Sequence, residues 1–250
     1  DWTMAAIHNL RRRLKSVKNT RQITRAMKLV SAARMKKAQD QIFQARPYAY
    51  KLRDVIRSIG AKDVVRHPLM VAREEQTVKV VVVSADRGLC GSFNAVINRR
   101  VVQLADEMQQ KEIRYDFVGR KAHDFFRNKL DTIDWARTDV FQKFDPSIST
   151  ELAAELVDDY TSERVDVIYV VYNEFKSVIQ QNLVVERLLP LVPEEFGGDE
   201  PEVPHKFEPD AETVLADMLP LYVENQLYRI LLESNAAEFA ARMTAMESAT

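Results

Sequence analysis

The first 60 residues carry small and apolar side chains at helical spacing. Most neighbours in this series are three or four residues apart: Leu10, Leu14, Val17, Thr24, Met27, Ser31, Met35, Ala38, Ile42, Ala49, Leu52, Ile56 and Ile59. Such spacing is typical of a coiled-coil helix. We predict one helix over residues 4–59, about 84 Å long at 1.5 Å per residue, with a bend near Pro47.

This seam is not that of a leucine zipper. Its middle is rich in small residues, and Arg21 and Lys28 stand where a zipper carries leucine. A surface less apolar than a leucine seam must therefore face it.

The pattern changes after Gly60 to buried strands alternating with helices. Runs rich in β-branched residues at 77–85 and 165–172 are typical of strands buried on both faces, which favours a parallel sheet. We expect further strands at 114–118 and, antiparallel at an edge, at 178–189. Helices are expected at about 93–110, 120–129 and 150–162. This alternation predicts an α/β, Rossmann-like domain.

A second long helix is predicted at the end of the chain. Residues 190–209 are rich in proline and acidic residues and are expected to form a loop. The helix then runs from about 210 to 250, with a kink or restart at Pro220. Two such helices most economically bury their apolar stripes on each other.

We therefore predict a long antiparallel coiled coil of the N- and C-terminal helices, which places both chain ends far from the α/β domain. The expected domains are 1–59, 60–209 and 210–250. In that register residue 250 lies beside about residue 19, and residues 4–18 project unpaired.

Charge is divided unevenly along the chain. The whole chain has 36 Lys+Arg and 37 Asp+Glu, but residues 1–46 hold 12 basic residues against Asp1 and Asp40 alone. The first segment therefore carries +10 and the remaining 204 residues −11. Like charges at helical spacing repel, so a rod of this kind favours an acidic partner over plain solvent exposure.

Few residues suggest chemistry within the chain itself. The turn 86–92 follows a buried strand and could bind an anion, but GxGxxG and GxxxxGK[ST] are both missing. A tight turn is the favoured reading there. The four histidines are scattered without metal-ligand spacing. A single cysteine, Cys90, excludes a disulfide within the chain and fits a reducing compartment. We expect no catalytic residue, cofactor or metal, and no apolar run spans a bilayer.

Four segments resemble one known family. They are SVKNTRQITRAMKLVSAARMKKAQ (16–39), ARPYA (45–49), SADRGLCGSFN (84–94) and YVENQLYRILLESNAAEFAARMTAMESAT (222–250). Together they closely resemble the gamma subunit of F-type ATP synthases, the central rotor shaft, over nearly the whole chain. The resemblance implies a non-catalytic subunit that couples proton-driven rotation of the c-ring to ATP synthesis or hydrolysis at the alpha/beta sites.

The resemblance also implies partners and positions. The coiled coil would lie inside three alpha and three beta subunits, and the α/β foot would sit on the epsilon subunit and the c-ring. The chain would be peripheral, on the cytoplasmic face of a bacterial inner membrane or the equivalent organelle face, without direct membrane insertion. Contacts to an acidic segment of beta are expected from a set of residues near the middle of the shaft: Arg21, Arg25, Met27, Lys28, Arg34, Lys36, Lys37 and Arg242. Foot contacts are expected from Tyr222, Glu224 and Gln226.

Two departures from the family pattern stand out. The second helix of the family normally continues several turns past the MESAT segment, so we expect that this chain is truncated at Thr250. The paired cysteines of the light-regulated chloroplast form are missing.

The alternative functions are a nucleic-acid-binding protein that uses its basic helix and a nucleotide-binding α/β enzyme. The first requires a leucine seam after the basic segment, as in bZIP proteins, and this chain has none. The acidic remainder would also repel phosphate.

Overall fold

The computed structural model describes residues 2–60, 67–141, 144–192 and 210–250. Two long helices, α1 (Trp2–Gly60) and α5 (Ala211–Ser248), run antiparallel beside one five-stranded sheet. The α/β fold with a long helix pair is therefore confirmed. Most of the predicted loop and His205 lie outside the described residues.

The sheet has strand order β3-β2-β1-β4-β5. The strands are β1 (Thr77–Val83), β2 (Glu112–Val118), β3 (Ile133–Arg137), β4 (Val167–Phe175) and β5 (Gln181–Leu189). The first four run parallel, and β5 pairs antiparallel with β4 at one edge. The predicted parallel core and antiparallel edge strand are both confirmed, and the order 3-2-1-4 of the parallel strands is that of a Rossmann-type sheet, with β5 added antiparallel beside β4.

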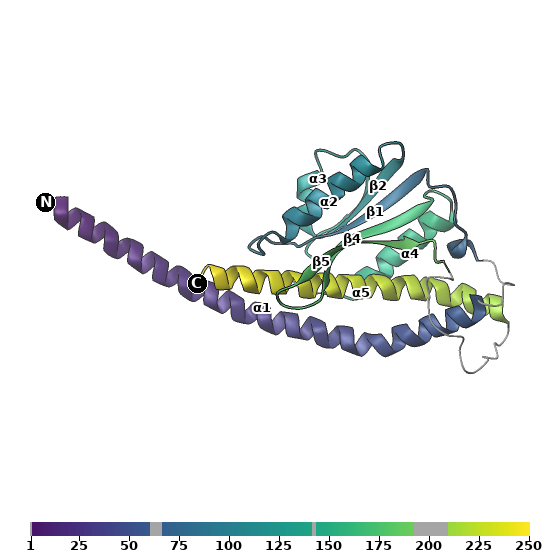
Figure 1. Cartoon of the computed structure of the whole chain (residues 1–250), viewed down its shortest axis with the longest axis horizontal. Helices are drawn as coiled ribbons and strands as arrows, with labels where there is room; N and C mark the ends of the chain where they lie inside the picture. Colours follow the sequence, from purple (N-terminus) through teal and green to yellow (C-terminus); the bar gives the residue numbers. More distant parts are fainter. Residues whose placement is uncertain (1, 61–66, 142–143, 193–209) are drawn as a thin grey trace.

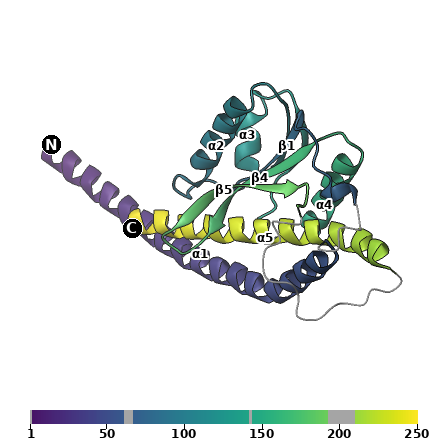
Figure 2. The same cartoon turned by 45° about the vertical axis from the view of Figure 1, so that its right-hand side comes forward.

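Helices cover both faces of this sheet. One face packs against α2 (Phe93–Glu107) and α3 (Arg120–Phe126). The other packs against α4 (Ser147–Thr161) and α5, so that α5 lies between the sheet and α1 (Figures 1 and 2). A short 3-10 helix, η1 (Pro68–Met70), adds Leu69 to the second face.

Strand β3 was not predicted from the sequence. It has five residues, IDWAR, and only its first and third are even half-buried. Such a polar edge strand has no clear hydrophobic alternation, and it forms because β2 offers a free edge beside it.

The helix pair has the predicted antiparallel direction with a shifted register. Thr250 Oγ1 lies 2.7 Å from Thr24 Oγ1, five residues further along α1 than predicted. Residues 7–23 of α1, including Leu10, Leu14 and Val17, are exposed and extend beyond the C-terminus (Figure 1). The unpaired projection of the first helix is thus confirmed for the described side chains.

Two expectations about α5 are wrong. The C-terminal end of the helix does not lie far from the α/β domain, because Ala237 shares a core cluster with the sheet and the Arg242 guanidinium donates to Gly88 O at 2.7 Å. Of the kink or restart expected at Pro220, the restart does not occur, since α5 continues through this residue. α1 likewise continues through Pro47 and is bowed along its length (Figure 1).

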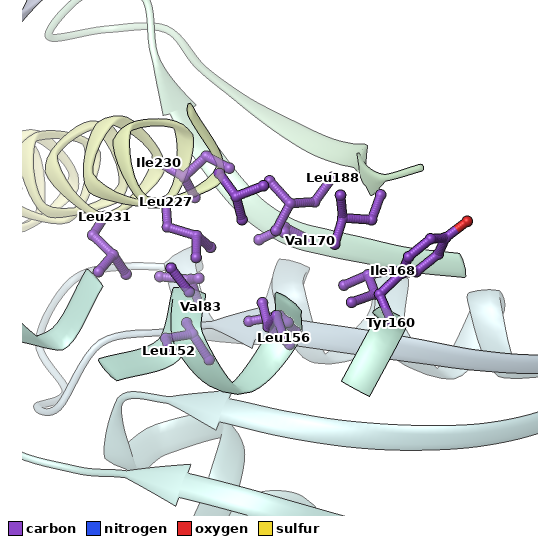
Figure 3. Close-up of a cluster of buried hydrophobic side chains, with 14 of the residues drawn as sticks. Val83, Leu152, Leu156, Tyr160, Ile168, Val170, Leu188, Leu227, Ile230 and Leu231 are labelled. Carbon is purple, nitrogen blue, oxygen red and sulfur yellow. The ribbon is translucent and has the colours of Figure 1, made fainter. Parts of the chain in front are cut away.

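The largest core cluster joins α5 to the sheet. Leu227, Ile230 and Leu231 of α5 meet Val83, Ile168 and Val170 of the strands, and α4 closes the cluster with Leu152, Leu156 and Tyr160 (Figure 3). All of these side chains are 0–1% exposed. The C-terminal helix is therefore part of the α/β core as well as of the helix pair.

Leu227→Ala tests this dual role of α5. Leu227 is fully buried, so its truncation should lower the free energy of unfolding by about 2–5 kcal/mol. Leu221→Ala is the matched control on the same helix, since Leu221 is 46% exposed, and should change stability by less than about 1 kcal/mol. Urea unfolding followed by circular dichroism measures both, and equal effects would contradict the packing of α5 described above.

A buried ionic cluster surrounds Lys79 near the start of β1. Lys79 of β1 is 1% exposed, and its Nζ lies 3.1 Å from Asp134 Oδ2, 3.3 Å from Asp116 Oδ2 and in contact with Asp159. Asp116 is fully buried and neither of its carboxylate oxygens accepts a hydrogen bond. Burial raises the pKa of Asp116 to about 7, although Lys79 opposes the shift.

Asp116→Asn should change how stability depends on pH. Because the folded protein holds the Asp116 proton up to about pH 7 and the unfolded chain releases it near pH 4, this group destabilises the fold increasingly as pH rises between those values. The substitution removes that loss. The unfolding free energy of Asp116→Asn relative to the parent should therefore increase from pH 4 to pH 7, and parallel pH profiles would contradict the assignment.

Candidate functional site

Seven of the eight residues predicted to contact the beta subunit lie on α1, beside or just beyond the end of α5, and Arg242 lies on α5. We use "collar" for Arg21, Arg25, Met27, Lys28, Arg34, Lys36, Lys37 and Arg242. Five of them, Arg21, Arg25, Arg34, Lys36 and Lys37, are exposed on α1. The structure thus leaves most of the collar charge open to a partner.

Two collar lysines already have acidic neighbours. Lys28 Nζ lies 2.6 Å from Glu247 Oε1 on α5, which is how a charged residue fits into the seam. Lys36 pairs with Asp40 at 2.9 Å one helical turn away. Both pairs are solvent-exposed and of the kind that contributes about 0–1 kcal/mol. They leave the charge of this part of α1 strongly positive.

A groove of about 370 Å³ separates the collar from the α/β domain. Met27 and Arg34 of α1, Phe239 and Arg242 of α5, and Asp86 of the turn after β1 line it. The Arg34 guanidinium carbon lies 5.6 Å above the Phe239 ring, within cation–π range. The fold therefore brings three collar residues, Met27, Arg34 and Arg242, to one groove.

Arg242 differs from the other collar residues because it is directed inward. Its side chain is 12% exposed and pairs with Glu238 one turn earlier on α5. Nε donates to Glu238 Oε1 at 2.9 Å, and Nη1 donates to the backbone oxygen of Gly88 at 2.7 Å. Burial raises the pKa of Glu238, and the Arg242 charge opposes that shift. The guanidinium is thus engaged within the chain.

The Asp86 carboxylate ties the start of the turn 86–92 to the start of α3 and to the segment after β3. Asp86 is 6% exposed and accepts three backbone N–H groups, from Arg120 at 3.1 Å, Asp139 at 2.7 Å and Phe141 at 2.8 Å. It lies at the carboxyl ends of the parallel strands, where α/β folds of this order bind ligands. These three backbone N–H groups already donate to the Asp86 side chain and are not free to bind an external anion. This agrees with the predicted tight structural turn.

The predicted foot residues lie on one stretch of α5 and are all half-buried. Glu224 Oε1 accepts from Thr150 Oγ1 of α4 at 2.7 Å, and Gln226 Oε1 accepts from Arg229 Nε at 2.9 Å. Arg229 in turn pairs with Glu186 of β5 at 2.6 Å. Burial raises the pKa of Tyr222. Glu224 thus links α5 to α4, and Gln226 binds the arginine that links α5 to β5. The three foot residues retain only part of their surface for a partner.

The described part of the chain contains no cluster of three His, Cys, Asp or Glu side chains arranged to hold a metal ion. In the same residues no helix is both long and apolar enough to span a membrane.

Known proteins resemble the chain along its full described length. A family model described as "ATP synthase" matches residues 6–250. The gamma chain of Pelotomaculum thermopropionicum ATP synthase is 43% identical over 248 residues, which cover 99% of this chain and 87% of that one. The gamma chain of Chloroherpeton thalassium is 40% identical over the same shares. The chain belongs to the ATP synthase gamma chain family.

Solved structures agree with this membership. The chain is similar to one in the central stalk and c-ring of Tetrahymena thermophila mitochondrial ATP synthase, with a TM-score of 0.70, 25% identity and coverage of 91% of this chain and 99% of that one. A rotor chain of the Euglena gracilis mitochondrial enzyme shares the fold with a TM-score of 0.66 at 21% identity, over 98% and 90% of the two chains.

These similarities confirm the family that the four sequence segments predicted. The gamma chain is the central-stalk rotor subunit of F-type ATP synthase, and the catalytic sites lie on the beta subunits. The basic helix therefore belongs to a rotor and not to a nucleic-acid-binding protein.

Sequence reasoning missed the roles of Asp86 and Glu238 in the gamma chain. Asp86 stood out only as part of a glycine-bearing turn, and its three donors come from segments 34 to 55 residues away. Glu238 is one acid among many in the sequence. An aspartate directly after a buried parallel strand was the one available signal, because such positions face the loops of neighbouring strands.

Asp86→Asn should destabilise this gamma chain. An amide keeps one acceptor oxygen but directs an NH₂ group at backbone N–H donors, so buried donors lose their partner. We expect a loss of about 3 kcal/mol in the free energy of unfolding. Asp131→Asn, at an exposed position, is the matched control and should change stability by less than about 0.5 kcal/mol. Denaturant unfolding measures the stability of both variants. Unchanged stability of Asp86→Asn would contradict the role given to this carboxylate.

Proposed function

We propose that this gamma chain couples rotation of a proton-driven c-ring to the catalytic sites through the exposed part of its basic collar. In this proposal α1 and α5 lie within a ring of three alpha and three beta subunits. Acidic segments of the beta subunits then meet Arg21, Arg25, Arg34, Lys36 and Lys37. Met27 lies in the adjoining groove.

The observation that carries the proposal is the exposure of one-signed charge. Every side chain from residue 7 to residue 23 is exposed, and so are the five basic collar residues named above. Apolar side chains in the segment 7–23 are exposed as well, including Leu14 at 57% and Ile23 at 60%. A helix with repelling charges and an uncovered apolar stripe is stabilised by an acidic partner that also covers the stripe.

The shape of the molecule supports a rotary role. The α/β domain lies on one side of the helix pair, and α1 alone continues past the end of α5 (Figures 1 and 2). Such a shaft presents different contacts to each surrounding site. A ligand or partner shifts an equilibrium only by its differential affinity for the states involved, so an asymmetric shaft can favour a different state at each beta subunit.

The proposal also covers the contacts of the α/β domain and the place of the chain at the membrane. Residues 60–209 would form the foot that sits on the epsilon subunit and the c-ring, with Tyr222, Glu224 and Gln226 at the boundary to the shaft segments 1–59 and 210–250. The similarity to the Tetrahymena central-stalk chain supports this placement. The chain would then be peripheral to the membrane, on the cytoplasmic face of a bacterial inner membrane or the equivalent organelle face.

Charge reversal tests the collar. The triple variant Arg21→Glu, Arg25→Glu, Lys37→Glu replaces three exposed positive charges of the collar with negative ones. We expect impaired assembly, or ATP synthesis reduced by roughly tenfold or more in the assembled complex, because like charges at a close interface cost several kcal/mol. Proton-driven ATP synthesis in membrane vesicles measures the outcome.

The control keeps charge and changes shape. Arg21→Lys, Arg25→Lys, Lys37→Arg retains all three positive charges and should keep most of the ATP synthesis activity. Unchanged coupling in the charge-reversed variant would sink the collar proposal. Equal loss in both variants would also contradict it, since shape and not charge would then decide.

A further inference from the structure

The inward direction of Arg242 indicates a role different from that of the exposed collar residues. Its side chain is 12% exposed, and its guanidinium bridges Glu238 of the same helix and the backbone oxygen of Gly88. Gly88 lies in the β1–α2 turn, 154 residues away in the chain. The contact therefore joins the end of the helix pair to the α/β domain.

The β1–α2 turn is itself tied to the carboxyl edge of the sheet. Asp86 accepts N–H groups from the start of α3 and from the segment after β3. Asn94 Oδ1 accepts from the backbone N–H of Ala85 at 3.0 Å, and Lys121 N–H donates to Ala85 O at 2.9 Å. The β1–α2 turn is thus hydrogen-bonded to two other segments of the domain, the start of α3 and the segment after β3.

Glu238 fixes the guanidinium in this position. Its side chain is 7% exposed and lies one helical turn before Arg242, so the two groups form a desolvated pair on α5. The planar fork of arginine can donate to the carboxylate and to a carbonyl at the same time, which a lysine ammonium reproduces poorly. A guanidinium held in this way has little left to offer an external acid.

We propose that Arg242 is a positioning residue that clamps the β1–α2 turn onto α5 and so transmits torsion between the helix pair and the α/β domain, instead of offering its charge to a beta subunit. The torsional part of this inference rests on the proposed rotor function. The clamp itself is a property of the isolated chain and is tested there.

The single cysteine provides a local reporter of the clamp. Cys90 is 1% exposed, lies two residues after Gly88, and its thiol donates to Arg87 O at 3.6 Å. Because the chain has no other cysteine, maleimide labelling reports only on this turn. Labelling requires the turn to open, and its rate also depends on the pKa of the Cys90 thiol, which burial and Glu238 raise and Arg242 lowers. Loss of Arg242 would by itself raise that pKa and slow labelling, so faster labelling of an Arg242 variant reports opening of the turn.

The first experiment compares maleimide labelling of Cys90 in the folded full chain. Arg242→Gln should label roughly tenfold faster or more, the factor expected for loss of one charge-assisted hydrogen bond. Arg34→Gln, which lines the same groove from α1, is the matched control and should label at the parent rate. Glu238→Gln keeps the arginine but removes its carboxylate, and should also label faster.

The labelling rates of these variants distinguish the clamp from a general effect of the groove. If Arg242→Gln does not fold by circular dichroism, Arg242→Lys decides in its place, because it keeps the positive charge near the Cys90 thiol and loses the planar fork. Parent-like protection of Cys90 in the folded variants would overturn the clamp. Equal acceleration in Arg34→Gln would also overturn it, because the groove as a whole, and not this arginine, would then hold the turn.

A second experiment in the assembled enzyme separates clamp from charge. Arg242→Lys keeps the positive charge and loses the fork, so the clamp predicts faster Cys90 labelling in the free chain and reduced ATP synthesis per proton translocated. Full coupling in Arg242→Lys together with loss in Arg242→Gln would show that charge alone matters, and would overturn the torsional role. The charge-reversed collar variant remains the separate test of the rotor proposal.

Discussion

The burial of α5 on two sides is the constraint on which the rest of the structure depends. One side of the helix packs on the sheet through Leu227, Ile230 and Leu231, and the other meets α1 through contacts such as Leu232 with Ile42 and Ala240 with Met35. A helix shared by two layers cannot move relative to one without disturbing the other. Shaft and domain therefore form one body, and α1, covered by α5 only along part of its length, is left to project.

Electrostatics follows the same division. Where α1 is covered, charged seam positions find partners in the chain, as Lys28 does in Glu247. Where it is uncovered, basic residues are exposed without nearby acids in their own segment. Within the domain the charged groups contact one another instead: Lys79 lies among three aspartates, and the half-buried Arg229 contacts Glu186, Tyr172 and Glu233. The uncovered part of α1 therefore keeps its charge exposed, whereas charged groups of the domain are engaged within the chain.

The candidate site shows how far residue type alone can predict a role. Most collar arginines and lysines are exposed, as a contact surface requires, but Arg242 carries the same charge and is directed inward. The foot residues are similarly engaged within the chain, Glu224 with Thr150 of α4 and Gln226 with Arg229 of its own helix. The sequence shows that a basic side chain can bind an acidic group. The fold decides whether that group belongs to a partner or to the same chain, as Glu238 does for Arg242.

Periodicity by itself determined the two long helices, their antiparallel pairing and the buried strands β1 and β4, because long apolar patterns leave one economical way of burial. The split of charge between the first 46 residues and the remainder was equally plain. Tertiary structure alone decided the polar edge strand β3, the shared burial of α5, the five-residue shift in register and the network around Asp86. These depend on contacts between segments far apart in the chain, and local pattern holds no information on which segment will meet which.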